Sequence, residues 1–393
     1  MINCLFLYYG ISLLYYIKVS GYKNEMVIYH FYTYDLCYNK NYEINNISYK
    51  EGISSYSLHL FSRFTTKGNF LITLDHQHVK YRFKSMYKYK WLHTYAHNNL
   101  TPKIRLNPHW VSGFVDARGC FMISVREQAG STGWGVSACF TLRSHINNLP
   151  LLLMIQSFFG GIGGIHVWKK SAIYRVGKLE YIINVIIPHF KQYPLQSSKK
   201  INFQLWSECV DILANKEHLS ELGLKKIISI KSAINKGLPE HLNLKFKDVK
   251  PIIRPEFIVN DNPLNPYWVS GFSEGYKRIS FDVFISSKII QVTVFYNIIL
   301  NIYDEPLILK IQEFFGGIGI ISHYNSVVQY IVADINNINS TLIPHFDTYI
   351  LYGNKLSNYL TWKEILLLVN SKAHLNPEGL SNIKSLKYNL NKW

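Results

Sequence analysis

Apolar residues recur with two different periods between residues 106 and 393, and the two periods alternate. The stretch NPHWVSGFVDA (107–117) has helical spacing, and Pro108 stands near its start, where a missing backbone N–H costs no hydrogen bond. CFMISV (120–125) and GVSACFTLRS (135–144) alternate with the period of two that is typical of strands, and a glycine-rich loop separates them. The sequence therefore predicts a helix followed by a β-hairpin.

The alternation continues through a second helix, a second hairpin and further helices. Residues 149–159 have helical spacing and end at Gly160, and the strands predicted at 163–168 and 172–177 flank a turn. The later helices are predicted at 178–190, broken by Pro188, at 198–215 and at 220–235. The resulting order, α-β-β-α-β-β-α-α, places this region in the α+β class.

The chain then repeats itself. LNPHWVSGF (106–114) returns as LNPYWVSGF (264–272), QSFFGGIGGI (156–165) as QEFFGGIGII (312–321), IPHF (187–190) at 343–346, and NKEHLSELGL (215–224) as SKAHLNPEGL (371–380). The last three pairs are offset by 156 residues and the first by 158. Ordered matches at nearly constant spacing indicate an internal duplication.

The duplication predicts four parts of the chain. They are a leader at 1–100 without a recognisable motif, a first repeat at 106–237, a polar, proline-punctuated linker at 238–263, and a second repeat at 264–393. The leader ends in KYRFKSMYKYK (80–90), which interleaves bases and aromatics as either an RNA-binding segment or an amphipathic strand does.

Composition restricts the partners of the protein. The formal net charge is +17 over 393 residues, which favours an anionic partner, either nucleic acid or an acidic membrane surface. The apolar segment 1–17 is slightly short for a spanning helix, so we expect a buried strand or helix and no stable membrane insertion. Five cysteines without a CxxC pair argue against disulfides and against structural zinc.

These motifs resemble the LAGLIDADG homing endonucleases and maturases in their single-chain, two-repeat form, of the mitochondrial intron-encoded type. The signature nonapeptide aligns with residues 111–119 and 269–277. The resemblance implies two pseudo-symmetric α-β-β-α-β-β-α repeats in a monomer, whose signature helices pack side by side. Small residues would let these helices approach closely, namely Ser112, Gly113, Ser270 and Gly271.

The resemblance also assigns a role to the residue before the final glycine of each motif. In the family it is an acid that holds divalent metal against the scissile phosphates. Here these positions are Arg118 and Tyr276, and Lys277 replaces the second glycine. A guanidinium ~4 Å from Mg²⁺ would repel it by roughly 8 kcal/mol at an effective dielectric near 20. We therefore expect no bound metal, and Mg²⁺ only if the protein cleaves DNA.

Two further acids stand near these positions. Asp116 and Glu274 come two residues earlier in each motif, which is about 200° of rotation on a helix, so they should point elsewhere. Lys199 and Lys355 match the place where the family often has a basic residue near the phosphate, although a lysine at a helix start is an equally good explanation.

The resemblance implies that strands of each half grip nucleic acid. Candidate phosphate or base contacts are Arg126, Arg143, Lys169, Lys170, Arg175 and Lys178 in the first half, and Arg278 and Lys288 in the second. In the matched stretch of the first repeat, basic residues outnumber acidic ones, whereas in that of the second repeat they do not. We therefore expect the second repeat to bind nucleic acid more weakly.

Three functions follow from these observations. The first is a mitochondrial, maturase-like protein that binds group I intron RNA and helps it to splice, a role that needs a basic surface but not the paired acids. The second is a site-specific homing endonuclease that cleaves double-stranded DNA with Mg²⁺. The third is a decaying reading frame that binds DNA without sequence preference.

Overall fold

The computed structural model divides the chain into two compact units, Met1–Thr101 and Pro102–Trp393. It describes residues 105–130, 132–286 and 291–390 with their side chains, and only the backbone of seven strands before residue 105. These strands form antiparallel sheets in the orders β1-β2-β3 and β4-β5-β6-β7. Their bounds are β1 Ile2–Tyr9, β2 Ser12–Val19, β3 Val27–Tyr32, β4 Asn41–Ile44, β5 His59–Phe64, β6 Phe70–His76 and β7 Val79–Lys80.

Beyond Lys80, the basic and aromatic run at 80–90 lies outside the described residues, as does Lys288. No helix in the described part of the chain is both long and apolar enough to cross a lipid bilayer.

The first repeat has the predicted element order. Its main elements are α2 Pro108–Arg118, β8 Gly119–Glu127, β9 Trp134–His145, α3 Leu149–Phe158, β10 Gly164–Trp168, β11 Ser171–Val176, α5 Ile187–Gln192, α6 Lys199–Ala214 and α7 Glu221–Lys231. The strands form one antiparallel sheet in the order β10-β11-β9-β8. Helix α2 begins where expected, because Asn107 caps it and Pro108 fills its first turn.

The second repeat follows the same plan. Its main elements are α9 Pro266–Gly275, β12 Ile279–Ile285, β13 Val292–Asn301, α10 Glu305–Phe314, β14 Ile320–Tyr324, β15 Val327–Val332, α12 Ile343–Thr348, α13 Asn354–Asn370 and α14 Pro377–Asn389. Its sheet has the order β12-β13-β15-β14, so the α+β class and the duplication are both confirmed. The linker between the repeats contains one short helix, α8 Glu240–Lys245.

One predicted break is wrong. The helical run of the first repeat continues from Leu179 to Gln192 and passes through Pro188. A π-helical turn at Ile182–Ile186 precedes the proline, and a second one at Ile338–Leu342 precedes Pro344 in the other repeat. Because proline has no N–H to donate to the preceding turn, the wider turn accommodates it without ending the helix.

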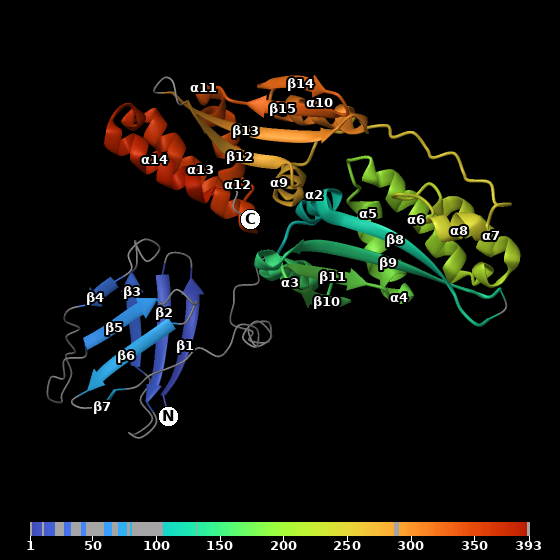
Figure 1. Ribbon diagram of the computed structural model, residues 1–393, viewed down its shortest axis with the longest axis horizontal. Helices are drawn as coiled ribbons and strands as arrows, with labels where there is room; N and C mark the ends of the chain where they lie inside the picture. The colour runs from blue at the N-terminus through green and yellow to red at the C-terminus, as the bar shows by residue number, and fades with distance from the viewer. Residues whose placement is uncertain are drawn as a thin grey trace. The chain divides into compact units, whose positions relative to one another are not determined.

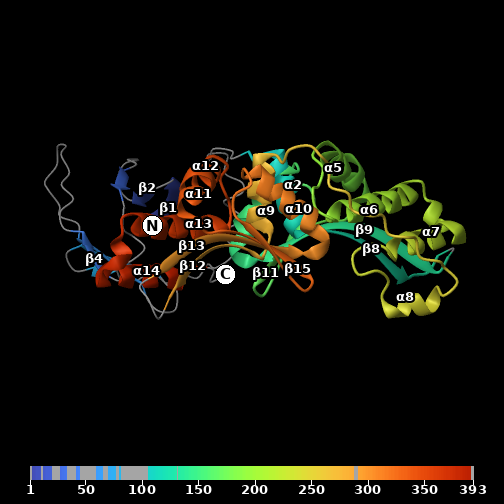
Figure 2. The same cartoon turned by 90° about the horizontal axis from the view of Figure 1, so that it is seen from above.

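Each repeat has its own aromatic core on one face of its sheet. Phe121 lies 5.1 Å from the ring of Trp206, and Phe281 lies 5.3 Å from that of Trp362. Figure 1 shows α5 and α6 against the first sheet and α12 and α13 against the second. In Figure 2, α2 and α9 lie side by side in the middle, with β12 and β13 to the left and β8 and β9 to the right.

Candidate nucleic-acid interface

Helices α2 and α9 join the two repeats through direct backbone contact. A Cβ atom placed on Gly113 would lie 2.1 Å from the carbonyl oxygen of Trp268, and one on Gly271 would lie 2.0 Å from that of Trp110. Real Cβ atoms do not approach backbone oxygens so closely, so glycine is required at both positions. The small residues of the two motifs therefore let the helices cross in contact.

The serines beside these glycines bind within their own repeats. The Ser112 hydroxyl donates to the carbonyl of Tyr193 at 2.7 Å, and that of Ser270 donates to Tyr349 at 2.6 Å. Both acceptors lie at the ends of α5 and α12. Each serine thus fixes the signature helix to the helix that covers its own sheet.

Asp116 is buried and fully engaged in hydrogen bonds. Its carboxylate accepts from the backbone N–H of Gln196 at 2.7 Å and from the hydroxyl of Ser197 at 2.5 Å. It also accepts from the indole N–H of Trp268, in the other repeat, at 2.9 Å. Burial raises the pKa of Asp116, whereas the bonds from Ser197 and Gln196 lower it. The carboxylate of Asp116 is thus bonded to the loop before α6 and to the opposite repeat.

Glu274 has the equivalent position in the second repeat. It is 3 % exposed and accepts from the backbone N–H of Gly353 at 3.0 Å and of Lys355 at 3.3 Å. It receives no indole bond, and the Nε1 atom of Trp110 is buried without a hydrogen-bond partner among the described residues. Asp116 thus accepts a hydrogen bond from the opposite signature helix, whereas Glu274 does not receive the equivalent bond from Trp110.

Arg118 and Tyr276 stand at the ends of the two signature helices. Arg118 is the last residue of α2, is half-buried, and makes no hydrogen bond or ion pair with any other described residue. Burial lowers its pKa and the nearby Glu274 raises it, but a guanidinium remains charged at neutral pH. Tyr276 follows α9 and stacks on Phe272, with ring centroids 5.2 Å apart.

Two partly buried lysines extend toward these helix ends. The Nζ atom of Lys199 donates to the carbonyl of Val115 at 3.1 Å. That of Lys355 donates to the carbonyls of Tyr276 and Ile279 at 2.5 and 2.6 Å. Ammonium groups at a helix C-terminus satisfy carbonyls that have no partner within the helix. Burial lowers the pKa of Lys199 to about 8 and that of Lys355 to about 7.

The structure thus brings Arg118, Lys199 and Lys355 near Asp116 and Glu274, close enough for their charges to interact. It also adds residues that sequence reasoning missed. Asp304 accepts from the N–H of Ser198 at 3.0 Å, and Asn148 accepts from that of Asn354 at 2.9 Å.

Both of these bonds cross between the repeats. Asn148 and Asp304, like Ser198 and Asn354, are equivalent positions 156 residues apart, but this offset does not show that they meet across the repeats. Asp304, Asp116, Lys199 and Tyr276 line a cavity of about 210 Å³ at this place.

Three arginines lie on one face of the first sheet. Arg126, Arg143 and Arg175 are exposed, and they alternate along their strands with core residues on the opposite face. Arg143 stands opposite Ile173, and Arg175 stands opposite Thr141, so β9 and β11 place these two guanidiniums diagonally. None of the three makes a hydrogen bond or ion pair with another described residue. The face therefore offers free guanidinium groups to an anion.

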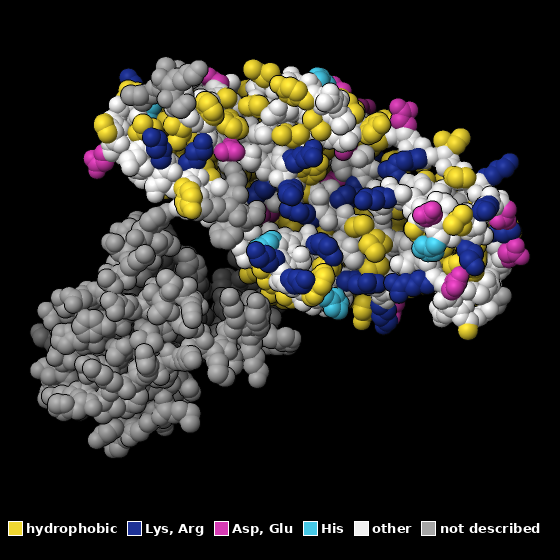
Figure 3. Space-filling view, in the orientation of Figure 1, with side chains coloured by type: hydrophobic (Ala, Val, Ile, Leu, Met, Phe, Trp, Pro, Cys, Tyr) yellow, Lys and Arg dark blue, Asp and Glu magenta, His cyan; other side chains and the backbone are white. Residues whose placement is uncertain are grey.

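The other candidate contacts lie at the borders of the sheets. Lys169 and Lys170 form the turn between β10 and β11, and Lys169 lies over the ring of Trp168 at 5.0 Å. Lys178 precedes α4 (Leu179–Tyr181) and pairs with Glu180 at 2.6 Å. Arg278 is exposed just before β12. Figure 3 shows Lys and Arg side chains gathered over β8 to β11.

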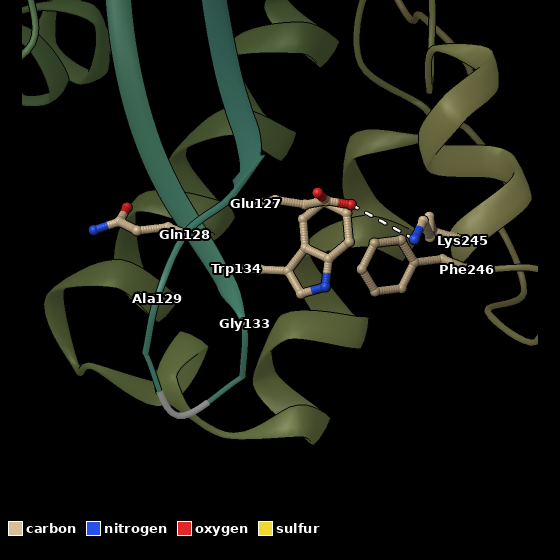
Figure 4. Close-up of a pocket in the computed structure, with 7 residues that line it drawn as sticks. All are labelled: Glu127, Gln128, Ala129, Gly133, Trp134, Lys245 and Phe246. Atoms are coloured by element: carbon tan, nitrogen blue, oxygen red, sulfur yellow. Dashed lines mark ion pairs between the residues drawn. The ribbon is translucent and has the colours of Figure 1, made fainter.

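The linker packs against the loop end of the β8–β9 hairpin. The ring of Phe246, after α8, lies 5.0 Å from that of Trp134, and Lys245 pairs with Glu127 at 3.6 Å (Figure 4). These residues line an open cavity of about 600 Å³. Farther along, the Ser229 hydroxyl donates to the carbonyl of Lys250. The linker is therefore fastened to the first repeat over much of its length.

The family model described as LAGLIDADG endonuclease matches residues 111–210 and 269–366. A Neurospora crassa protein named "Probable intron-encoded endonuclease 3" is 35% identical over 294 residues, which are 72% of this chain and 54% of the relative. A Podospora anserina protein named for ND4 intron 1 is 35% identical over 131 residues, 33% of this chain and 28% of its own. The chain thus spans about half the length, or less, of these relatives.

Solved structures of the family have the same architecture. The I-SmaMI LAGLIDADG homing endonuclease bound to cleaved DNA is 34% identical, with a TM-score of 0.70, over 73% of this chain and 97% of its own. The two matched segments of the family model coincide with the two repeats described above. The chain belongs to the LAGLIDADG endonuclease family and carries both repeats in one polypeptide.

Proposed function

We propose that this protein binds double-stranded DNA at a defined site and does not cleave it. The observation that carries the proposal is at the ends of the two signature helices, where Arg118 and Tyr276 stand in place of acids. Family resemblance assigns metal binding to these two positions. Neither residue supplies a carboxylate, and Arg118 adds a fixed positive charge.

The donor chemistry at the helix ends does not fit a divalent cation. Mg²⁺ prefers oxygen ligands, usually one or two carboxylates, with most of its water retained. Asp116 already accepts from two backbone N–H groups, a hydroxyl and an indole, and Glu274 from two backbone N–H groups. Leaving those donors without acceptors in a buried place costs several kcal/mol. These two acids are therefore poor candidates to replace the missing metal ligands.

The basic face of the first sheet supports DNA as the partner. Arg126, Arg143 and Arg175 are free of partners among the described residues and point away from the core. A two-stranded ribbon fits the major groove of B-form DNA, and guanidinium groups bind both phosphates and base edges there. The structural relative I-SmaMI is described as bound to DNA.

A binding selection tests the proposal. The full chain is incubated with a random duplex library at about 0.15 M salt, and bound duplexes are amplified and sequenced. We expect one family of sites to be enriched, and the best site to bind about 10³-fold or more tightly than a scrambled duplex. Absence of any enriched duplex, from protein shown to be folded by circular dichroism, would overturn the proposal.

Relatives named as intron-encoded support a mitochondrial location, because one of them is named for an ND4 intron. A fluorescent fusion followed by fractionation tests this part of the proposal. Recovery of the protein outside mitochondria would contradict it.

A second candidate is a maturase-like role on group I intron RNA. Arg118 favours it, since a half-buried guanidinium that bonds to no other described residue matches phosphate oxygens of either nucleic acid. Competition between the enriched duplex and a transcript of the host intron decides between the two. Displacement of the duplex by an equimolar amount of intron RNA would make RNA the preferred ligand.

A further inference from the structure

The two sheets present chemically different faces on the side away from their cores. The four strands of the first sheet contain three arginines, all on that face, whereas the four strands of the second contain neither lysine nor arginine. In Figure 3, uncharged and hydrophobic side chains predominate over β13 to β15 of the second repeat.

Strand register shows which residues replace the arginines. Arg143 stands opposite Ile173 in the first sheet, and Ile299 stands opposite Gln329 in the second. Arg175 stands opposite Thr141, and Ile331 stands opposite Asn297. Equivalent positions in the two repeats are 156 residues apart: Arg143 and Ile299, Ile173 and Gln329, Arg175 and Ile331, and Thr141 and Asn297. Two isoleucines therefore occupy the places of two guanidiniums.

A pair of amides lies beside these isoleucines. The side-chain N–H of Gln329 donates to Oδ1 of Asn297 at 3.0 Å. Among the described residues, the Nδ2 donor of Asn297 and the Oε1 acceptor of Gln329 have no further partner and can meet a ligand. Adenine presents an acceptor, N7, and a donor, the N6 amine, in the major groove, so this pair complements it. Exposed apolar side chains on the same face, such as Phe284, complement the methyl group of thymine.

We propose that the protein reads an asymmetric DNA site, with guanines in the half that faces the first sheet and A·T pairs in the half that faces the second. Arginine binds guanine through O6 and N7, and loss of one such contact costs about tenfold or more in affinity. The inference rests on the proposed duplex-DNA binding and specifies its target.

Sequences from the binding selection test the inference, together with two exchanges between equivalent positions. Wild-type protein should enrich sites with guanines confined to one half and A·T pairs in the other. The variant Arg143→Ile/Arg175→Ile should lose the guanine preference in that half alone. The matched variant Ile299→Arg/Ile331→Arg should gain guanines in the other half, and circular dichroism checks the folding of both.

The possible failures are distinct. Enriched sites with the same base composition in both halves, or with no base preference in the half facing the second sheet, would overturn the inference and leave DNA binding in place. Variants that fold but keep the wild-type preference would also overturn it. No enriched duplex at all would overturn the proposed function itself, and this inference with it.

Discussion

The indole N–H of Trp268 donates a 2.9 Å hydrogen bond to Oδ2 of Asp116, so a carboxylate of one repeat is held by a ring of the other. The same carboxylate binds the loop before α6 through Gln196 and Ser197. The side chain of Asp116 thus connects helix α2 to the loop before α6 and to helix α9 of the opposite repeat. Glu274, the acid at the equivalent position, likewise accepts hydrogen bonds from the backbone at the start of α13.

Replacing Asp116 should therefore destabilise the protein. Asp116→Ala leaves the buried indole and backbone donors without acceptors, and we expect the free energy of unfolding to fall by about 3 kcal/mol. Urea denaturation followed by tryptophan fluorescence measures the change. Glu256→Ala, which removes an exposed carboxylate in the linker, is the control. Equal stability of the two variants would contradict a structural role for Asp116.

The close crossing of α2 and α9 predicts that adding one methyl group at either crossing glycine destabilises the protein. Gly113→Ala and Gly271→Ala place a Cβ atom against a backbone carbonyl that cannot move without separating the helices. We expect each to lower the free energy of unfolding by about 3 kcal/mol, as overpacking does. Gly130→Ala is the matched control, because a Cβ atom there meets nothing within 4 Å. A stable Gly113→Ala protein would show that the helices are farther apart.

The partly buried lysines Lys199 and Lys355 predict a pH dependence of stability. Burial lowers the pKa of Lys355 to about 7 from its ordinary value of 10.5, so the unfolded chain binds more protons between these values. The free energy of unfolding should therefore rise with pH, by about 2 kcal/mol for this group between pH 7.5 and 9.5. The cysteines and, above pH 10, the tyrosines act in the opposite direction, because burial raises their pKa values.

Lys355→Met tests this dependence. The variant loses two carbonyl contacts and should be less stable at every pH, but its stability should rise less steeply from pH 7.5 to 9.5. Lys384→Met, at an exposed position on α14, should keep the wild-type slope. Identical slopes for all three proteins would show that Lys355 is charged in the fold throughout this range.

Restoring the acids should create affinity for Mg²⁺. The variant Arg118→Glu/Tyr276→Glu removes one fixed positive charge and supplies a carboxylate at each helix end, which is the ligand type that Mg²⁺ prefers. Isothermal titration of the DNA complex with Mg²⁺ should give saturable heat for this variant and none for wild type. Equal Mg²⁺ binding by both proteins would mean that other groups hold the metal.

The order of helices and strands in the two repeats could be predicted from the sequence, because it depends on short local patterns and each pattern occurs twice. Pro108 and Asn107 define the start of α2, and the 156-residue offset defines equivalent strands. The rotation of a helix alone placed Asp116 away from Arg118. The break predicted at Pro188 failed because the backbone before it widens into a π-helical turn, which no residue pattern indicates.

Contacts between the repeats could not be predicted in the same way. The bond from Trp268 to Asp116 depends on where two helices cross, and the bond from Ser198 to Asp304 joins loops that are distant in sequence. The 156-residue offset alone matches Arg143 with Ile299, but the strand register was needed to show which residues stand opposite each of them in the sheets.

Integrity of bound DNA decides most directly whether cleavage has been lost. The best duplex from the selection, labelled at both ends, is held in excess wild-type protein with Mg²⁺ or Mn²⁺, and both strands are followed on a denaturing gel. We predict full occupancy and intact strands over hours. Accumulation of discrete products from both strands would show that the protein cleaves DNA despite Arg118 and Tyr276.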